Sequence, residues 1–249
     1  MSHPKKGDKV TFKIEGRTYN GRYGDSLLEQ LRMHGYEVPS LCYHEAVSPY
    51  GSCRLCLVEV KKGRKQKVTT SCNYPVQEGI EVFVDTDKVK RYRKVVLQLH
   101  LAKSPNAKAV RELAAEYGVM ETPYEVQQQD MENDCVLCGL CSRVCDEIVS
   151  ASAINFTGRG QHKRMQSPYD ETAEACIGCG ACVYVCPTDC IGLQESDGVR
   201  HIQKWHRDLP LQTCEKCGKQ FFPTFMLMEF SKRTGISKEQ LTTCPACRG

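Results

Sequence analysis

Apolar and polar residues alternate over residues 9–15, which places Val10, Phe12 and Ile14 on one face of the segment. Alternation with a period of two is typical of a β-strand with one buried face. A glycine-containing turn follows, and residues 18–22 have the pattern of a returning strand. The pattern therefore predicts a β-hairpin.

The period changes to that of a helix after this hairpin. Three leucines between residues 27 and 31 form an apolar stripe, and Asp25 or Ser26 stands where an N-cap residue belongs. Gly35 stands at the matching C-terminal position. We therefore predict one short helix directly after the hairpin.

Further strands are predicted at residues 57–60, 68–70 and 80–84, with a basic turn at residues 61–65 between the first two. A strand pair, a helix and further strands describe a β-grasp fold. We therefore predict a β-grasp domain over residues 1–87. The basic turn is interpreted as solvated rather than as a partner-binding patch.

Residues 91–119 have a helical period, and we interpret residues 88–130 as a helical linker. The apolar positions on which this rests are Val95, Leu99, Leu101, Val110, Leu113 and Ala114.

Cysteines carry the candidate chemistry, because the chain has 17 of them in repeated spacings. Two runs, at residues 135–145 and 176–186, have the form C-x₂-C-x₂-C-x₃-C. Two-residue gaps let three thiolates converge on one [4Fe–4S] cluster, and in two-cluster ferredoxins the fourth cysteine binds the other cluster. A disulfide framework is the weaker alternative, because this duplicated spacing is typical of metal binding.

The two runs predict a bacterial-ferredoxin-like domain with two neighbouring [4Fe–4S] clusters at residues 131–195. Backbone N–H groups near Gly51, Gly139 and Gly178 are expected to tune the cluster potentials. The ligands assigned to one cluster are Cys135, Cys138, Cys141 and Cys186. The ligands assigned to the second cluster are Cys176, Cys179, Cys182 and Cys145.

Four more cysteines lie in the predicted β-grasp domain with the spacing C-x₁₀-C-x₂-C-x₁₅-C. Thiolates on a loop and a hairpin are typical of plant-type [2Fe–2S] sites, although the first gap is longer here. The predicted ligands of this [2Fe–2S] cluster are Cys42, Cys53, Cys56 and Cys72.

A fourth metal site is predicted near the carboxyl end, where 26 residues separate two C-x₂-C knuckles. Paired knuckles close a tetrahedral four-thiolate site, so we favour one zinc ion over a further iron site in a zinc-ribbon-like module at residues 205–249. Its predicted ligands are Cys214, Cys217, Cys244 and Cys247. A short amphipathic helix is expected from Phe222, Phe225, Met226, Met228 and Phe230.

One cysteine, Cys190, falls outside these sets, and we interpret it as a small buried hydrophobe beside a cluster rather than as an exchangeable ligand. The formal net charge of +4 does not favour nucleic acid as a partner. No apolar run reaches the length of a membrane span, and the first residues lack the apolar core of a signal peptide. We expect a soluble cytoplasmic protein in a reducing compartment, and the clusters suit an anaerobe.

A family resemblance is carried by residues 41–44, 51–60 and 71–72, by the two cubane runs and by residues 156–160 (FTGRG). The chain resembles the iron–sulfur amino-terminal region of the largest peripheral-arm subunit of bacterial complex I. It is also similar to the small diaphorase subunits of NAD(P)-linked hydrogenases, formate dehydrogenases and electron-bifurcating oxidoreductases. The resemblance covers about residues 8–195.

The resemblance implies particular partners. They are a flavin (FMN) subunit that binds NAD(P), a small thioredoxin-like [2Fe–2S] subunit, and a catalytic hydrogenase or dehydrogenase subunit. In that family the linker usually holds a further [4Fe–4S] cluster through one histidine and three cysteines. Residues 91–119 contain His100 but no cysteine, so we expect this cluster to be lost and His100 to be a packed or capped core histidine rather than a ligand.

An α+β chain with three cluster sites, a linker and a ribbon therefore predicts an electron-transfer subunit of a multisubunit NAD(P)H-linked oxidoreductase, with electron bifurcation as the favoured type. No glycine-rich phosphate loop and no acid–base pair stands near the clusters, so no catalytic residue is assigned and catalysis is expected of the complex. Two alternatives stay open: a free-standing ferredoxin-like carrier, and a nucleic-acid-binding regulator that uses the ribbon.

Overall fold

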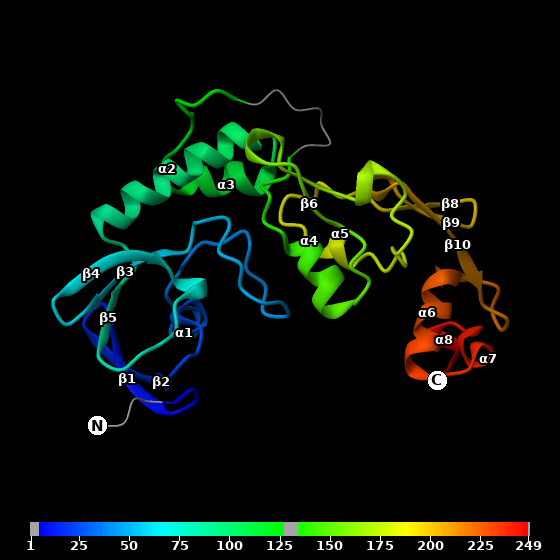
Figure 1. Ribbon diagram of the computed structural model, residues 1–249, viewed down its shortest axis with the longest axis horizontal. Helices are drawn as coiled ribbons and strands as arrows, with labels where there is room; N and C mark the ends of the chain where they lie inside the picture. The colour runs from blue at the N-terminus through cyan, green and yellow to red at the C-terminus, as the bar shows by residue number, and fades with distance from the viewer. Residues whose placement is uncertain (1–4, 127–133, 249) are drawn as a thin grey trace. The chain divides into compact units, whose positions relative to one another are not determined.

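The computed structural model describes residues 5–126 and 134–248, and the chain divides into two compact units, Met1–Cys138 and Gly139–Gly249 (Figure 1). The expected domain boundary between residues 130 and 131 lies outside the described residues. Elements of the first unit are β1 (Lys9–Ile14), β2 (Arg17–Arg22), α1 (Leu27–Met33), β3 (Leu57–Lys62), β4 (Lys65–Thr70), β5 (Ile80–Phe83), α2 (Asp87–Lys103) and α3 (Lys108–Glu116).

The second unit is built from short elements. They are α4 (Leu140–Arg143), β6 (Asn155–Thr157), β7 (Arg164–Gln166), α5 (Ala181–Tyr184), β8 (Gln194–Ser196), β9 (Val199–Ile202), β10 (Arg207–Thr213), β11 (Gln220–Pro223), α6 (Thr224–Thr234), α7 (Lys238–Leu241) and α8 (Pro245–Arg248).

A five-stranded sheet forms the base of the first unit, in the order β2-β1-β5-β3-β4. The predicted hairpin is present, because β1 and β2 pair antiparallel, and β5 lies between β1 and β3, parallel to β1. This topology is the one expected of the β-grasp prediction. The basic turn is shorter than predicted, because Lys61, Lys62 and Lys65 continue the ladder of β3 and β4.

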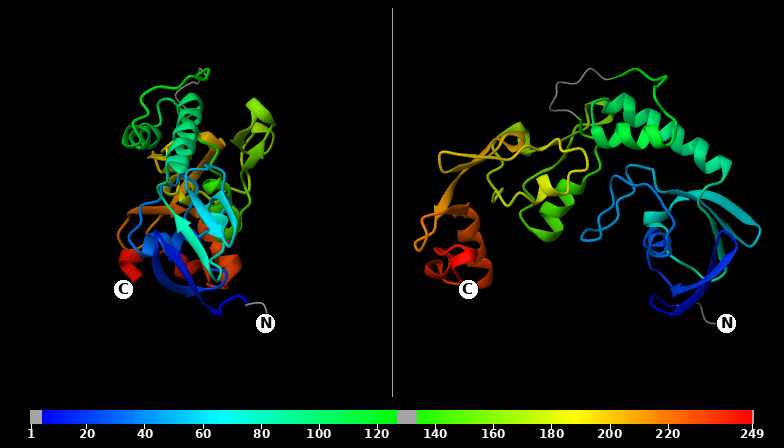
Figure 2. Two further views of the ribbon diagram at one scale, coloured as in Figure 1. Left: turned by 90° about the vertical axis from the view of Figure 1, so that its left-hand side faces the viewer. Right: turned by 180° about the vertical axis from the view of Figure 1, so that it is seen from behind.

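The core of this unit lies between the sheet and α1, which runs beside the strands (Figure 2). Leu27, Leu28 and Leu31 are fully buried there, as their helical spacing predicted. Gly35 follows the helix with a φ of 79°, a conformation that favours glycine at this end. Burial of the leucine stripe under the sheet is what fixes the position of the cysteine-bearing loops after α1.

The linker forms two helices, α2 and α3, that lie side by side (Figure 1). The predicted apolar stripe on α2 was partly wrong, because Val95 is 39% exposed and Leu99 is 49% exposed. The face of α2 that is buried instead carries Val89, Arg93, Leu97 and Leu101, spaced four residues apart.

Arg93 explains this change of face. Its guanidinium donates hydrogen bonds to the carbonyl oxygens of Leu57 at 2.6 Å and Val84 at 3.0 Å, and to the hydroxyl of Tyr117 at 3.2 Å. Leu57 begins β3, Val84 directly follows β5, and Tyr117 directly follows α3. One buried arginine therefore holds α2 against the β-grasp sheet and against α3.

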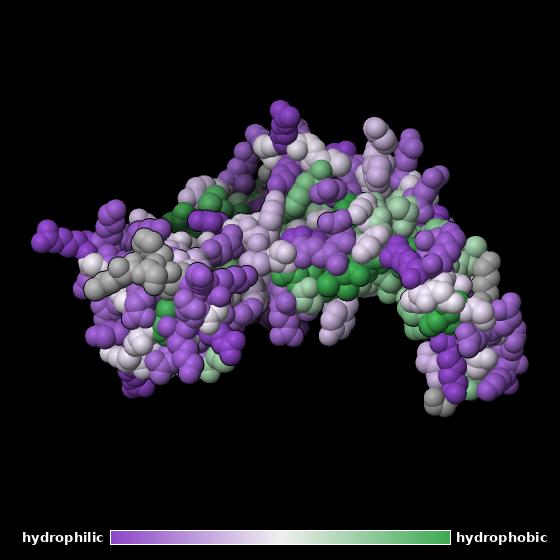
Figure 3. All heavy atoms as spheres, turned by 60° about the horizontal axis from the view of Figure 1, so that its bottom comes forward, coloured by the Kyte–Doolittle hydropathy of each residue, from purple (hydrophilic) through white to green (hydrophobic). Residues whose placement is uncertain are grey.

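A second sheet, in the order β11-β10-β9-β8, lies within residues 194–223, where the sequence pattern predicted no strands. Phe222 was wrongly placed in the expected helix, because it lies in β11 and α6 begins at Thr224. Leu227 is the buried residue of α6. Hydrophobic side chains still reach the surface of this otherwise mostly hydrophilic carboxyl-terminal region, in which Phe222 is 37% and Phe230 45% exposed (Figure 3).

Within the described residues, no helix combines the length and the apolar character that a bilayer crossing requires.

Candidate functional site

The four cysteines of the predicted [2Fe–2S] site are buried in the first unit, with exposed fractions of 1–3%. Cys42 and Cys53 lie in the loop between α1 and β3, Cys56 directly precedes β3, and Cys72 lies in a 3₁₀ turn directly after β4. The antiparallel β3–β4 ladder brings Leu57 opposite Thr70, so Cys56 and Cys72 are carried to the same end of the hairpin. The fold thus gathers cysteines that are far apart in the sequence.

Hydrogen bonds to sulfur shape this site. The backbone N–H of Leu41 donates to Cys53 Sγ at 3.4 Å, and that of Cys53 donates to Cys42 Sγ at 3.5 Å. A hydrogen bond from Cys53 lowers the pKa of Cys42 to about 5, and one from Cys72 lowers the pKa of Cys56 to about 6. The same contacts raise the pKa of Cys53 and of Cys72. Because a thiolate is the form that binds metal, Cys42 and Cys56 are the members of the two pairs that lose a proton more readily.

Two neighbours of this loop support it. Gly51 has a φ of 74°, a backbone conformation in which a larger residue would be strained, and a Cβ there would lie 2.7 Å from the side-chain amide nitrogen of Asn73 and would have to displace it. His100 Nε2 lies 2.9 Å from the carbonyl oxygen of Cys53, and burial lowers the pKa of this imidazole. The sequence predicted a packed or capped histidine at this position. His100 is half-buried, and its ring contacts the carbonyl oxygen of the cysteine loop.

Four further cysteines converge in the second unit around one small cavity. Cys145 follows α4, Cys176 and Cys179 precede α5, and Cys182 lies within α5. All four line the cavity, whose other walls include Ile202 from β9 and the indole of Trp205. The structure thus brings together the four residues that the sequence assigned crosswise to the second [4Fe–4S] cluster.

N–H groups point at two of these sulfurs. The backbone N–H of Ala153 donates to Cys145 Sγ, and the indole N–H of Trp205 donates to Cys182 Sγ, each at 3.4 Å. Burial raises the pKa of the Cys182 thiol to about 12, and the Trp205 bond acts against this shift. Trp205 was missed by sequence reasoning, because it stands 23 residues after the cysteine that it contacts.

The ligands assigned to the first [4Fe–4S] cluster are Cys135, Cys138, Cys141 and Cys186, and they fall in different units, so this set stays a prediction. Cys186 Sγ lies 3.6 Å from Cys190 Sγ, and this contact raises the pKa of Cys186. Cys190 is half-buried.

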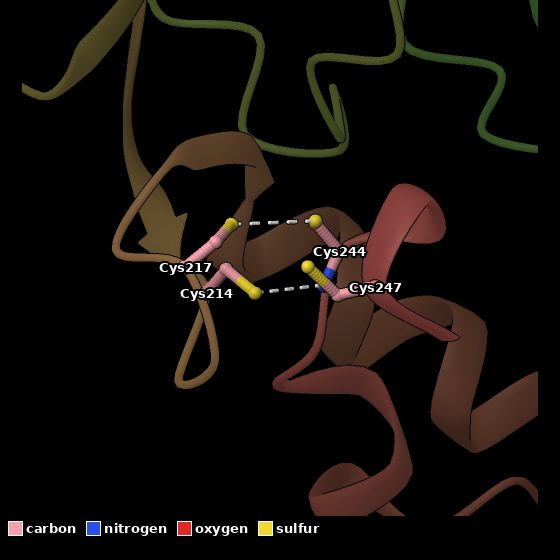
Figure 4. Close-up of side chains that lie close together, drawn as sticks. All are labelled: Cys214, Cys217, Cys244 and Cys247. Atoms are coloured by element: carbon pink, nitrogen blue, oxygen red, sulfur yellow. Dashed lines mark hydrogen bonds between the residues drawn. The ribbon is translucent and has the colours of Figure 1, made fainter. Parts of the chain in front are cut away.

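At the carboxyl end, Cys214, Cys217, Cys244 and Cys247 bring their sulfurs within 4.8 Å of one another (Figure 4). Among the residues that the structure describes, this is the one group of possible metal ligands whose donor atoms all lie that close together. Four thiolates at the Zn–S distance of about 2.3 Å in a tetrahedron lie about 3.8 Å apart. Cys217 Sγ and Cys244 Sγ are 3.8 Å apart, so the site has the dimensions for one ion.

The protonation of this four-cysteine site follows its hydrogen bonds. The backbone N–H of Cys244 donates to Cys214 Sγ at 3.3 Å and lowers the pKa of Cys214 to about 6 (Figure 4). Contact with Cys217 raises the pKa of Cys247 to about 12. A metal ion would replace the thiol protons, and its positive charge would offset the repulsion between neighbouring thiolates.

Comparison with known families agrees with this cysteine arrangement. Residues 7–87 match the 2Fe-2S iron-sulfur cluster binding domain, and residues 129–193 match a 4Fe-4S dicluster domain. A second 4Fe-4S dicluster model matches residues 175–219, which include Cys214 and Cys217 but neither cysteine of the other knuckle.

Curated relatives include the NADPH-Fe(3+) oxidoreductase subunit alpha of Geobacter sulfurreducens, 28% identical over 200 residues that cover 72% of this chain and 23% of the relative. The NADH-ubiquinone oxidoreductase 75 kDa subunit of Reclinomonas americana is 27% identical over 173 residues, covering 61% of this chain and 25% of the relative. The chain thus spans about a quarter of the length of these relatives.

A solved structure described as NAD+-reducing [NiFe]-hydrogenase in the H2-reduced state also resembles the chain. It has a TM-score of 0.56 and 26% identity, and the match covers 64% of this chain and 74% of the other. With the two domain matches, these relationships confirm the predicted resemblance. The chain carries a 2Fe-2S domain followed by 4Fe-4S dicluster sequence and is a relative of iron–sulfur subunits of NAD(P)-linked oxidoreductases and hydrogenases.

Proposed function

We propose that the chain is an iron–sulfur electron-transfer subunit of a multisubunit NAD(P)H-linked oxidoreductase, with flavin-based bifurcation as the favoured type. Cys42, Cys53, Cys56 and Cys72 would hold one [2Fe–2S] cluster, and the two cubane runs would hold two [4Fe–4S] clusters. When bound, such clusters supply one-electron transfer. The relatives named above support a partner that handles NAD(P)H, and the family resemblance supports a flavin subunit and a thioredoxin-like [2Fe–2S] subunit.

One contact inside the first unit carries this proposal. The hydroxyl of Ser52 donates a hydrogen bond to the carbonyl oxygen of Cys138 at 3.2 Å. Ser52 directly precedes Cys53, a predicted [2Fe–2S] ligand, while Cys138 is a predicted cubane ligand. The loop of one predicted site therefore touches the loop of the next, although 86 residues separate the two partners.

The linker supports a shortened series of clusters. Between Cys72 and Cys135 the sequence has no cysteine, and His100 is engaged with the carbonyl of Cys53. A histidine without neighbouring thiols does not bind a cubane. In this proposal α2 and α3 support the [2Fe–2S] loop by packing. Electrons would pass across the Ser52–Cys138 contact instead of through a fourth cluster.

For the carboxyl-terminal four-cysteine site we propose a structural zinc ion. Four converging thiolates satisfy a closed tetrahedral site, and a site without an open position suits structure rather than chemistry. The 3.8 Å separation of Cys217 Sγ and Cys244 Sγ supports one ion at this point.

Anaerobic elemental analysis tests the cofactor set. The ligand supply predicts about ten irons per chain, two in the first site and eight in the cubane pair, together with about one zinc. A count of about fourteen irons would mean that a further cubane is present and would contradict the proposed series. Absence of zinc with an eleventh iron would replace the zinc assignment with a mononuclear iron.

Crosswise ligation has its own test. Cys145→Ser should perturb the cluster bound by Cys176, Cys179 and Cys182, and leave the EPR signal of the other cubane in place. If the variant loses the other cubane instead, the assignment of Cys145 is wrong.

Partner dependence separates a subunit from a free carrier. Purification of the native protein under anaerobic conditions should recover it with a flavin protein, identified by mass spectrometry and by its flavin absorbance. Elution of the native protein alone, near its own mass of 28.1 kDa, would favour the free-standing carrier.

A further inference from the structure

The loop of the second cubane site is packed directly on the carboxyl-terminal sheet. Gly178 stands between the ligands Cys176 and Cys179 with a φ of 73°. A Cβ at Gly178 would lie 2.5 Å from Leu209 Cδ1 on β10 and 3.0 Å from Pro223 Cγ on β11. Because there is no space for even a methyl group, the loop and the sheet form one packed body.

Arg200, on β9, fastens this loop from one side. Its Nη1 donates to the carbonyl oxygen of Gly178 at 2.6 Å. Its charge is matched, because Nε and Nη2 donate to Glu195 Oε1 at 2.9 and 2.6 Å. Arg200 therefore fixes the position of the loop, while Glu195 neutralises most of its charge.

Arg207, the first residue of β10, fastens the loop from the other side. Its Nε donates to the carbonyl oxygen of the ligand Cys176 at 3.0 Å, and its Nη2 donates to that of Glu174 at 3.2 Å. The guanidinium carbon lies 5.2 Å from the ring centroid of Phe225, at the start of α6. No ion pair to Arg207 occurs among the described residues. Its positive charge therefore lies beside the cluster loop without a carboxylate to neutralise it.

The four-cysteine site lies at the far end of the same strand. β10 runs from Arg207 to Thr213, and Cys214 follows directly. Phe225 is the second residue of α6, and the chain returns from α6 through α7 to Cys244, whose N–H donates to Cys214 Sγ. An ion bound by the four cysteines would therefore close the segment from Cys214 to Cys247, which contains Phe225. Arg207 lies outside this segment, on the strand that leads into it, and touches it through the Phe225 ring.

We infer that Arg207 is a positioning residue of the second [4Fe–4S] site, and that metal binding at Cys214, Cys217, Cys244 and Cys247 holds it there and so sets the reduction potential of that cluster. This inference rests on the proposed function for its ligand set. A fixed positive charge beside a cluster stabilises the reduced form, which carries one more negative charge. Arg207 therefore raises the reduction potential, and the carboxyl-terminal module acts on electron transfer without itself changing oxidation state.

The experiment compares midpoint potentials of the anaerobic, fully loaded chain by EPR-monitored redox titration. Arg207→Gln should make the second cubane harder to reduce, by about tenfold in the ratio of reduced to oxidised cluster, or about 59 mV for one electron. Arg207→Lys keeps the positive charge and loses the paired guanidinium hydrogen bonds, so it should shift the midpoint potential less. Lys219→Gln removes the same charge from an exposed side chain of the same module and should leave the potential unchanged.

Loss of the ion provides the second arm. Cys217→Ser removes a ligand whose side chain is exposed, and it should shift the same cubane in the same direction as Arg207→Gln while iron content stays at the wild-type value. Combining Cys217→Ser with Arg207→Gln should give no further shift, because both changes remove one contact.

The outcomes separate this inference from the proposed function. If the wild-type chain loads both cubanes and Arg207→Gln leaves the midpoint potential within the range of Lys219→Gln, the inference is overturned and the proposed function stands. Additive shifts of Arg207→Gln and Cys217→Ser would overturn the coupling to the ion. If the wild-type chain loads no cluster on Cys145, Cys176, Cys179 and Cys182, the proposed function falls and takes the inference with it.

Discussion

The [2Fe–2S] site of the first unit and the four-cysteine site at the carboxyl end contain the same four donors in different surroundings. In the first site all four cysteines are buried and associate as two hydrogen-bonded pairs, Cys42 with Cys53 and Cys56 with Cys72. In the second, four sulfurs surround one point and Cys217 is exposed. Ligand count alone therefore does not decide what a cysteine site holds.

The difference follows from what each site is built on. The [2Fe–2S] loop is covered by the β-grasp core and by α2, through His100 and Arg93. The four-cysteine site rests on short elements, with little core beneath it, and such modules commonly depend on their metal for folding. Burial protects a redox centre from solvent, whereas a structural ion needs closure and not depth.

The largest expected effect is a separation of metal losses. Cys56→Ser should remove about two irons and the [2Fe–2S] EPR signal, because one of four ligands is lost. Cys244→Ser should remove the single ion and no iron. Elemental analysis of the two variants measures both, and loss of iron in Cys244→Ser would show that the sites are alike.

Chelation should distinguish the sites by rate. A soluble chelator reaches the exposed Cys217 side of the four-cysteine site, so its ion should leave at least about tenfold faster than iron leaves the buried [2Fe–2S] site. Timed metal release into an anaerobic chelator solution measures the two rates. Equal rates would mean that burial does not govern access.

Removal of Arg93 should expose the dependence of the first site on α2. Arg93→Met leaves the carbonyl oxygens of Leu57 and Val84 without their donor, and we expect a loss of about 3 kcal/mol in the free energy of unfolding of this unit. Denaturant titration followed by the visible circular dichroism of the [2Fe–2S] cluster measures it. Arg91→Met, on the exposed face of the same helix, is the matched control and should change little.

A smaller effect is expected at His100. His100→Ala removes the hydrogen bond to the Cys53 carbonyl and should cost about 1 kcal/mol of local stability. Faster amide hydrogen exchange around residues 52–56 is the measurement. Leu99→Ala, half exposed on the same turn, should leave that exchange unchanged, and an equal response from both variants would reduce His100 to a packing role.

Elements whose signals are local were predictable from the sequence. The hairpin of β1 and β2, helix α1 and the strands β3, β4 and β5 all appear where alternation or leucine spacing placed them. On α2 the prediction was wrong for Val95 and Leu99, because the buried face includes Arg93. A pattern of apolar residues does not identify the buried face of a helix when one of the buried side chains is charged and bonded to carbonyl oxygens.

The candidate sites divide in the same way. Cysteine spacing was sufficient to group Cys145 with the run that begins at Cys176, and to group the two carboxyl-terminal knuckles. Spacing had no information on Trp205 or Arg207, because both reach the second cubane site from a sheet that forms only when distant strands pair. Contacts of this kind are long-range, and a sequence pattern does not record them.

Trp205 also makes the second cubane site optically visible. It is the only tryptophan in the chain, and its indole is buried against the sulfur of Cys182. An iron–sulfur cluster absorbs broadly where indole emits, so a cluster at this distance would quench nearly all of the chain's tryptophan emission. The ultraviolet fluorescence of the intact chain is thus a built-in gauge of whether this one site is filled, readable during cluster loading without any label.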